Sequence, residues 1–326
     1  NMVADKRQGS FLVWGIAGWL ALIQISIAAS QLLLALAVFL WLYQIWKRKA
    51  AFVSIPIDTA ILLYAGWSLL AAAFSFDPFS SAGSIKQLTL IVIPYLLVSS
   101  LHHTETLERL VLLLILIADV GALAGLWQYC FGSLGDLNHR IQGFMGHYMT
   151  YSGQLVLVIA LAGGRLLFDK RERIWSALVM PALLVALALT LTRSAWVGAC
   201  AALALLCVLK DLRLIAVLPL LAALFVTFAP PQLTNRLYST FDLQNPTNRD
   251  RIAMARAGVR MVEDHPLTGV GPDVVKEVYP EYRDATAVQD NNPHLHNVPL
   301  HIAAERGLPA LVVWLGFLVL VVRDLI

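Results

Sequence analysis

Residues 290–307, with the sequence DNNPHLHNVPLHIAAERG, concentrate titratable side chains directly ahead of a hydrophobic run at 308–322. Ionisable groups at the edge of a membrane are costly, so they usually have a partner or a function there. The stretch contains His294, His296, Asn297, His301, Glu305 and Arg306. Histidine has an ordinary pKa at which it can accept a proton from a hydroxyl group near neutral pH. We therefore predict that His296 is a general base, with a hydrogen-bonded interface histidine as the alternative.

A metal site is the other chemistry that this stretch could hold. His294 and His296 could bind a metal together with Asp290. The third ligand would be weak, and no second pair of histidines or cysteines supports it elsewhere in the chain. Cys130, Cys200 and Cys207 form no CxxC spacing, which indicates neither metal nor redox chemistry. We expect no metal and no cofactor, and we expect His294, Asn297 and Glu305 to contact substrate.

Two arginines are candidates for binding phosphate, because the guanidinium group offers a fixed fork of donors that matches phosphate oxygens. Arg193 lies in LTLTRSAWVGA, between two apolar runs. Arg251 opens an expected amphipathic helix at 248–264, where free backbone N–H groups also favour anions. The alternatives are a snorkelling arginine at 193 and, for the helix arginines, a solvated face or attraction to lipid headgroups.

Other polar residues could line the same pocket. The substrate-binding candidates outside the histidine stretch and the two arginines are Arg249, Arg140, His147 and Lys86. For each of them a solvated loop residue or an interface anchor is an equal alternative. The segment GVGPD at 269–273 is not a nucleotide-binding loop, because no GxxxxGK[ST] motif is present.

The amino-acid composition indicates that most of this chain is surrounded by membrane lipid rather than by water. Of the 326 residues, 59% are hydrophobic and 14% are charged, whereas soluble domains carry roughly 25% charged residues. The net charge of +3 is too small to indicate a nucleic-acid partner. The chain is therefore expected to be an all-α, polytopic transmembrane helical bundle in contact with membrane lipids.

About ten apolar runs are long enough to suggest spans, which need about 20 residues each. They lie near 11–29, 31–46, 57–76, 84–101, 107–130, 151–168, 174–192, 194–209, 214–230 and 308–322. The basic clusters in short loops all fall on one side, which the positive-inside rule makes cytoplasmic. Both ends of the chain are then cytoplasmic. We expect a bundle at 1–230, a large, partly helical outward loop at 231–298, and a last span at 299–326.

Three segments together resemble the O-antigen ligase/polymerase superfamily: LTRSAWVGA, NRDRIAMARAGVRMVEDHPLTGVGP and PHLHNVPLHIAAERGLPAL. The segment RIQGFMGHYMTYSG is similar to the family's outward loop before the sixth span. The family positions fall on Arg193, Arg251 and His296. The family usually has about twelve spans, whereas about ten are predicted here.

The resemblance implies metal-independent, inverting glycosyl transfer at the periplasmic face of the bacterial inner membrane. The donor would be a glycan on undecaprenyl pyrophosphate, and for a ligase the acceptor would be lipid A-core. Arg193 and Arg251 would stabilise the leaving pyrophosphate, and His296 would take the proton of the acceptor hydroxyl. The alternatives are an O-antigen or exopolysaccharide polymerase and a protein O-oligosaccharyltransferase. An anion transporter is less favoured, because no inverted repeat is visible.

Overall fold

The computed structural model describes residues 2–47, 52–132, 134–217, 219–220, 223, 227 and 229–325. All regular structure in these residues is helical, which confirms the all-α prediction. The chain forms two compact units. Unit 1 comprises residues 1–51 and 97–241, and unit 2 comprises residues 52–96 and 242–326. The division into bundle, outward loop and last span concerns position in a membrane and stays a prediction.

Unit 1 is a helical bundle whose core is made of aliphatic and small side chains. Leu155, Ile159 and Leu183 are almost fully buried between its helices, and Ala162 and Ala186 are buried in the same core. Small residues let membrane helices pack closely without a hydrophobic driving force. Its helices are α1 (Met2–Leu22), α2 (Ile27–Trp46), α6 (Thr104–Phe131), α7 (Tyr148–Phe168), α8 (Arg173–Leu189), α9 (Arg193–Lys210), the 3₁₀ helix η2 (Leu212–Ala216) and α11 (Pro231–Tyr238).

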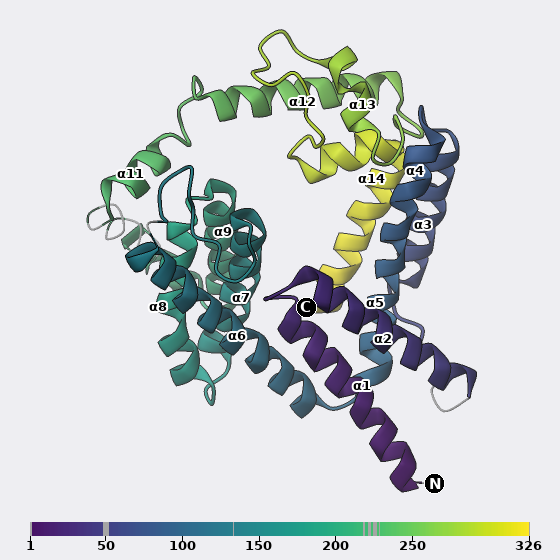
Figure 1. The fold of residues 1–326 in the computed structure, drawn as a ribbon, viewed down its shortest axis with the longest axis vertical. Coiled ribbons are helices and arrows are strands. Elements are labelled where there is room, and N and C mark those ends of the chain that lie inside the picture. The colour runs from purple at the N-terminus through teal and green to yellow at the C-terminus, as the bar shows by residue number, and fades with distance from the viewer. Residues whose placement is uncertain are drawn as a thin grey trace. The chain divides into compact units, whose positions relative to one another are not determined.

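Unit 2 combines apolar helices with two polar, amphipathic ones. Its elements are α3 (Asp58–Ala73), α4 (Pro78–Ser84), the 3₁₀ helix η1 (Ile85–Ile91), the start of α5 (Val92–Ser100), α12 (Pro246–Asp264), α13 (Val275–Tyr282) and α14 (Val298–Leu325). In Figure 1, α12 and α13 lie over the first part of α14, and α3 runs alongside α14. Gly307, with φ 80° and ψ 171°, kinks α14 near its start.

Within the part of the chain that the structure describes, six helices are long and apolar enough to cross a membrane, by length and composition. They are Ile27–Trp46, Pro78–Ser100, Thr104–Phe131, Tyr148–Phe168, Arg193–Lys210 and Val298–Asp324. Three further predicted spans correspond to shorter apolar helices: Phe11–Leu22, Asp58–Ala73 and Arg173–Leu189. Seven of the 17 residues of the predicted span at 214–230 lie outside the described residues.

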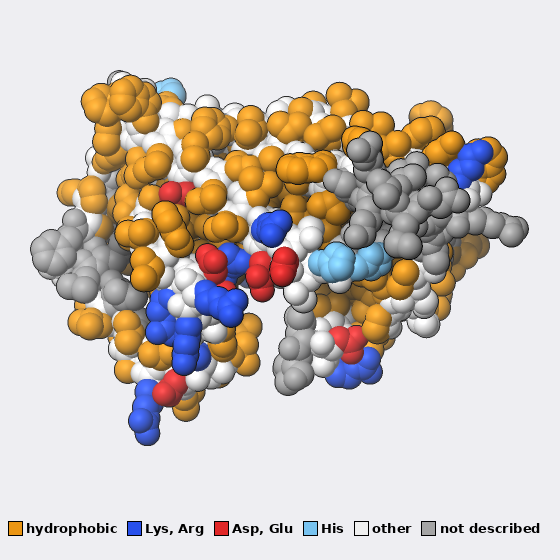
Figure 2. Space-filling view, turned by 90° about the horizontal axis from the view of Figure 1, so that it is seen from below, with side chains coloured by type: hydrophobic (Ala, Val, Ile, Leu, Met, Phe, Trp, Pro, Cys, Tyr) orange, Lys and Arg blue, Asp and Glu red, His pale blue; other side chains and the backbone are white. Residues whose placement is uncertain are grey.

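The surface agrees with a lipid environment. Large apolar side chains such as Leu32, Leu62 and Val312 are between 66% and 74% exposed. Figure 2 shows hydrophobic side chains over most of the face that it draws, with charged side chains gathered in limited areas. A water-soluble monomer rarely exposes so much contiguous apolar area. The protein is a multi-pass membrane protein.

Candidate active site

The loop that carries the predicted base is fixed at its start by a buried carboxylate. Asp250, 7% exposed, lies in the first half of α12. Its Oδ1 accepts hydrogen bonds from the backbone N–H groups of Val288 (3.1 Å) and Gln289 (3.2 Å), and its Oδ2 accepts from Asn292 Nδ2 (3.4 Å). A carboxylate that accepts several hydrogen bonds holds its donors in one geometry. Asp250 therefore clamps the chain just ahead of His294 and His296.

A buried leucine between His294 and His296 holds the same loop in place. Leu295, 2% exposed, packs into the core of unit 2 beside Met254 and Met261 of α12. Its approach depends on Gly258, because a Cβ there would lie 2.6 Å from Leu295 Cδ1. With Leu295 turned inward, the neighbouring side chains of His294 and His296 are exposed.

His296 occupies an unusual backbone position and has a lowered pKa. Its φ is +50°, in the left-handed region that non-glycine residues seldom adopt and that is often found at functional sites. Partial burial of the ring lowers its pKa, and the nearby charges of Arg251 and His294 lower it further. At neutral pH the imidazole is therefore uncharged and able to accept a proton. Arg251 and His294 thus lie close enough to His296 for their charges to act on it. That Arg193, Arg251 and His296 work together stays a prediction.

The backbone around Arg251 differs from the prediction. Helix α12 begins at Pro246, not at 248, and Asn245 caps it by accepting from Thr247 N–H. Arg251 is thus in the second turn, where its own N–H group belongs to the helix. The expected contribution of free backbone N–H groups at Arg251 was therefore wrong, and what remains is the exposed guanidinium group.

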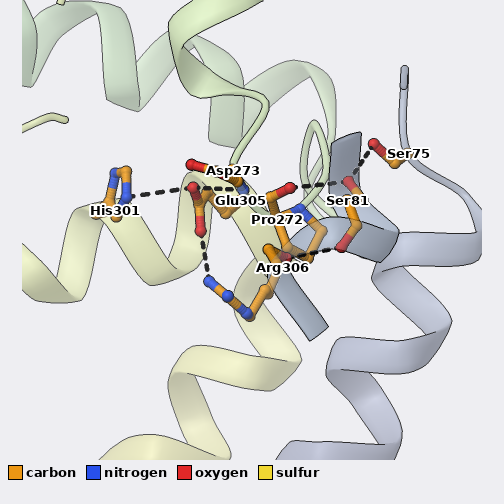
Figure 3. A network of polar contacts seen from close by, with 8 residues as sticks. Ser75, Ser81, Pro272, Asp273, His301, Glu305 and Arg306 are labelled. Atoms are coloured by element: carbon orange, nitrogen blue, oxygen red, sulfur yellow. Dashed lines mark hydrogen bonds and ion pairs between the residues drawn. The ribbon is translucent and has the colours of Figure 1, made fainter. Parts of the chain in front are cut away.

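The side chain of Glu305 forms its hydrogen bonds and ion pairs with residues other than His296. Its Oε1 lies 3.2 Å from His301 Nε2 and accepts from the backbone N–H of Asp273 at 2.8 Å, while its Oε2 pairs with Arg306. Figure 3 shows the Glu305 carboxylate between His301 and Arg306, beside the backbone of Asp273. The carboxylate is 4% exposed and joins α14 to the segment at 269–273. A direct contact of Glu305 with substrate stays a prediction.

The glycine-rich segment at 269–273 is a structural cradle. Val270 and Gly271 donate their N–H groups to the carbonyls of Ala304 (2.8 Å) and Glu305 (3.0 Å). A Cβ on Gly271 would lie 1.9 Å from Ser75 Oγ, and one on Gly307 would lie 1.9 Å from the Leu267 carbonyl oxygen. Both glycines have positive φ angles, so no other residue suits these positions. The segment thus ties the start of α14 to α4.

Arg193 lies in unit 1, at the first position of α9, and is 5% exposed. Its Nη1 donates to the carbonyl oxygen of Ser239 at 2.6 Å. Arg236 donates from Nε to the carbonyl of Leu191 at 3.2 Å, and Leu191 itself has φ +53°. These bonds join the turn between α8 and α9 to α11 and to the residue that follows it. Arg193 and the pair Arg251 and His296 belong to different units, and their meeting stays a prediction.

The remaining predicted residues divide between the units. In unit 2, Arg249, Lys86 and Asn297 are exposed, and Asn297 Oδ1 accepts from the N–H of Leu300 at the start of α14. In unit 1, Arg140 lies over the Tyr148 ring at 4.3 Å, and the exposed His147 stacks on the same residue. Their contact with substrate stays a prediction.

Sequence reasoning missed two residues. Asp250 had no assigned role, although a carboxylate between two arginines in NRDR was a signal for a structural partner. His301 had none either, yet its ring lies edge-on to His294 at 5.5 Å and bonds to Glu305. Its spacing of four residues from Glu305 on one helix face could have indicated the pair. In the described part of the chain, no group of three or more His, Cys, Asp or Glu side chains could hold a metal.

The match to known families covers this arrangement. Residues 177–315 form an O-antigen ligase domain, as a family model of that description matches them. This range contains Arg193, α12 with Arg251, the His296 loop and the Glu305 clamp, which confirms the predicted family. The family implies lipid-linked glycans as the general substrate class. Searches of curated proteins and of solved structures found no match.

Proposed function

We propose that the protein transfers an O-antigen glycan from undecaprenyl pyrophosphate to lipid A-core. The observation that carries this proposal is the loop of His296 beside Arg251. An uncharged imidazole is exposed at a residue with left-handed backbone, near the guanidinium group of Arg251 and within the segment that matches the O-antigen ligase model. A base beside an anion-binding group is what glycosyl transfer from a pyrophosphate needs.

His296 is the proposed general base. The acceptor hydroxyl oxygen attacks the anomeric carbon of the donor glycan, and its proton passes to the His296 imidazole. The clamp of Asp250 and the anchor of Leu295 hold the ring in place, which reduces the cost of reaching the reactive geometry. Attack from the face opposite the leaving group inverts the anomeric configuration.

Arg251 and Arg193 are the proposed leaving-group residues. As the anomeric C–O bond breaks, the lipid pyrophosphate departs with the electron pair and gains negative charge. Guanidinium groups positioned at that charge stabilise the transition state. The proposal needs no metal ion, because the two arginines supply the positive charge, and no ATP, because the pyrophosphate linkage is already activated. The proposed substrate contacts are Arg249, Arg140, His147, Lys86, His294, Asn297 and Glu305.

The proposed location is the bacterial inner membrane, with the site facing the periplasm. The support is the distribution of basic residues in short loops, which places the stretch at 231–298 opposite them. Both lipid-linked substrates would then reach the site from the outer leaflet.

The test is glycan transfer by purified protein given undecaprenyl-pyrophosphate glycan and lipid A-core, with EDTA present. Wild type should glycosylate lipid A-core, and His296→Ala should lower the rate by about 10²–10⁴-fold, the usual contribution of a general base. His102→Ala, an exposed histidine outside the site, is the matched control and should retain full activity. Full activity of a folded His296→Ala variant would refute the base. Longer lipid-linked chains in place of modified lipid A-core would identify a polymerase.

A further inference from the structure

Helix α14 carries an imidazole and a carboxylate on the same face, ahead of its kink at Gly307. His301 and Glu305 are four residues apart, and Nε2 of His301 lies 3.2 Å from Oε1 of Glu305. The carboxylate is held from two further sides, because it also accepts from the backbone N–H of Asp273 and pairs with Arg306. Figure 3 shows these contacts around Glu305. The carboxylate is therefore a fixed acceptor for the imidazole.

The contact with Glu305 determines which nitrogen of His301 carries the proton. A neutral imidazole has one N–H donor and one acceptor nitrogen. Because the carboxylate is an acceptor, the proton of neutral His301 belongs on Nε2, and Nδ1 is left as the acceptor. A carboxylate bonded to an imidazole selects the tautomer in the same way in hydrolase triads. The other side of the His301 ring thus presents a lone pair of electrons.

This lone pair lies next to the loop that carries the proposed base. Nδ1 of His301 is buried and has no hydrogen-bond partner in the part of the chain that the structure describes. Buried polar atoms are usually satisfied, so this nitrogen indicates a missing donor. The ring of His294 lies edge-on to that of His301, with centroids 5.5 Å apart and planes at 82°. His294 is exposed, and exposed side chains change rotamer rapidly, so a ring N–H of His294 is the nearby donor.

We propose that Glu305, His301 and His294 form a hydrogen-bonded chain in which His301 is a positioning residue. Glu305 keeps the proton of His301 on Nε2, and Nδ1 of His301 accepts from a ring N–H of His294. The other ring nitrogen of neutral His294 then carries no proton and is an acceptor. An acceptor at this exposed position of the loop suits a hydroxyl donor, which is the group that sugars present in large number.

The task of His294 follows from its neighbour, and this step rests on the proposed function. His294 and His296 flank the buried Leu295, so both imidazoles are exposed on the same loop. His296 takes the proton of the attacking hydroxyl, whereas His294 accepts a hydrogen bond from a second hydroxyl of the same acceptor sugar. A site that hydrogen-bonds a substrate hydroxyl discriminates against substrates that lack it. His294 thus selects the acceptor sugar, and His301 holds it in the form that can do so.

The hydrogen-bonded chain is tested by nitrogen NMR of the purified full chain with isotope-labelled histidine. The spectrum shows which nitrogen of each neutral imidazole carries the proton, and single substitutions assign the signals. We expect the Nε2–H form for His301, and in His294→Phe a shift of its Nδ1 signal toward that of a nitrogen without a hydrogen bond. His265→Phe is the matched control, since His265 lies edge-on to Phe76 at 4.9 Å in the same unit, and it should leave the signal in place. Thermal unfolding in detergent selects the variants that remain folded.

Two spectral outcomes would overturn the chain. One is a proton on Nδ1 of neutral His301, and the other is an Nδ1 signal that stays unchanged in folded His294→Phe. Neither outcome depends on glycan transfer, so the spectrum decides the chain even if the proposed function fails.

Steady-state kinetics with lipid A-core then separate positioning from packing at residue 301. His301→Gln keeps an N–H donor for Glu305 and an oxygen acceptor for His294, whereas His301→Phe keeps only the bulk of the ring. We expect His301→Phe and His294→Phe to raise KM for the acceptor about tenfold, the size of one lost hydrogen bond, with kcat nearly unchanged. His301→Gln should keep the wild-type KM. A wild-type KM in His301→Phe with a raised one in His301→Gln would show that residue 301 serves packing, and a wild-type KM in His294→Phe would overturn the selection of the acceptor.

Discussion

Arg193 and Arg251 are predicted to share one task, yet the two units embed them in opposite ways. In unit 1, Arg193 is 5% exposed and its guanidinium group is bonded to the carbonyl of Ser239. In unit 2, Arg251 is exposed and acts on its surroundings through its charge, which lowers the pKa of His296. A buried arginine that bonds to backbone also holds the fold, whereas an exposed one is available to a ligand.

The difference shows that a residue of a family motif can contribute to both stability and activity, and that the share of each differs from one residue to the next. A hydrogen bond from a charged group to a buried carbonyl contributes about 1.5–3 kcal/mol. Substitution of an exposed side chain usually has little effect on stability. Measurements of activity alone would therefore not distinguish the roles of the two arginines, so the stability of each variant must be measured as well.

Among the tests of this comparison, the largest expected effect comes from Arg251→Ala, which should lower glycan transfer by about 10²–10³-fold through the loss of charge at the leaving group. Its thermal unfolding temperature should remain that of wild type. Arg193→Ala should lower both activity and the unfolding temperature, because it removes the hydrogen bond from Arg193 to the Ser239 carbonyl. Transfer assays and thermal unfolding in the same detergent measure both quantities. An equal loss of stability in the two variants would break the comparison.

A smaller effect is expected from matched glycine substitutions, one in each unit. Gly258→Ala in α12 places a Cβ 2.6 Å from Leu295 Cδ1 and 2.9 Å from Leu300 Cδ2. Overpacking of this kind costs typically about 1–3 kcal/mol, and it displaces the residue that anchors the His296 loop. Gly164→Ala in α7 meets no atom within 4 Å and should be neutral or stabilising.

The measurement is thermal unfolding together with transfer activity for both glycine variants. Gly258→Ala should lose activity as well as stability, since Leu295 and His296 are adjacent. Wild-type activity in Gly258→Ala would show that the loop does not depend on this anchor.

Much of the local structure of the site could be predicted from the sequence. Apolar residues at helical spacing indicated α12 and its end at Asp264. These signals depend on residues close in the chain. The start of α12 was misplaced by two residues, because the capping role of Asn245 was not recognised.

The tertiary partners could not be predicted in the same way. The bonds of Asp250 to residues 288, 289 and 292 join positions about 40 apart, and no local pattern specifies them. The segment at 269–273 pairs with Ala304 and Glu305, just ahead of the kink at Gly307 in α14, and no local pattern indicates this pairing either. The sequence could indicate which residues belong to the site, but tertiary packing determines which residues they bond to.

The smallest expected effect, and the sharpest test of Arg251 as a source of charge, is a shift in the pH dependence of transfer. The pKa of His296 lies below its ordinary value, with partial burial as the main cause and Arg251 as the next. A general base acts in its uncharged form, so activity should be constant at neutral pH and fall as the pH drops through this lowered pKa. Arg251→Gln removes the positive charge, so the pKa rises toward its ordinary value. The acid limb of the residual activity should therefore move to higher pH. Arg256→Gln is the matched control. It removes one charge from the same helix, at a residue that pairs with Asp284, and it should leave the acid limb in place. An acid limb that stays fixed in Arg251→Gln would mean that burial alone sets the state of His296, and that Arg251 acts on the phosphate or not at all.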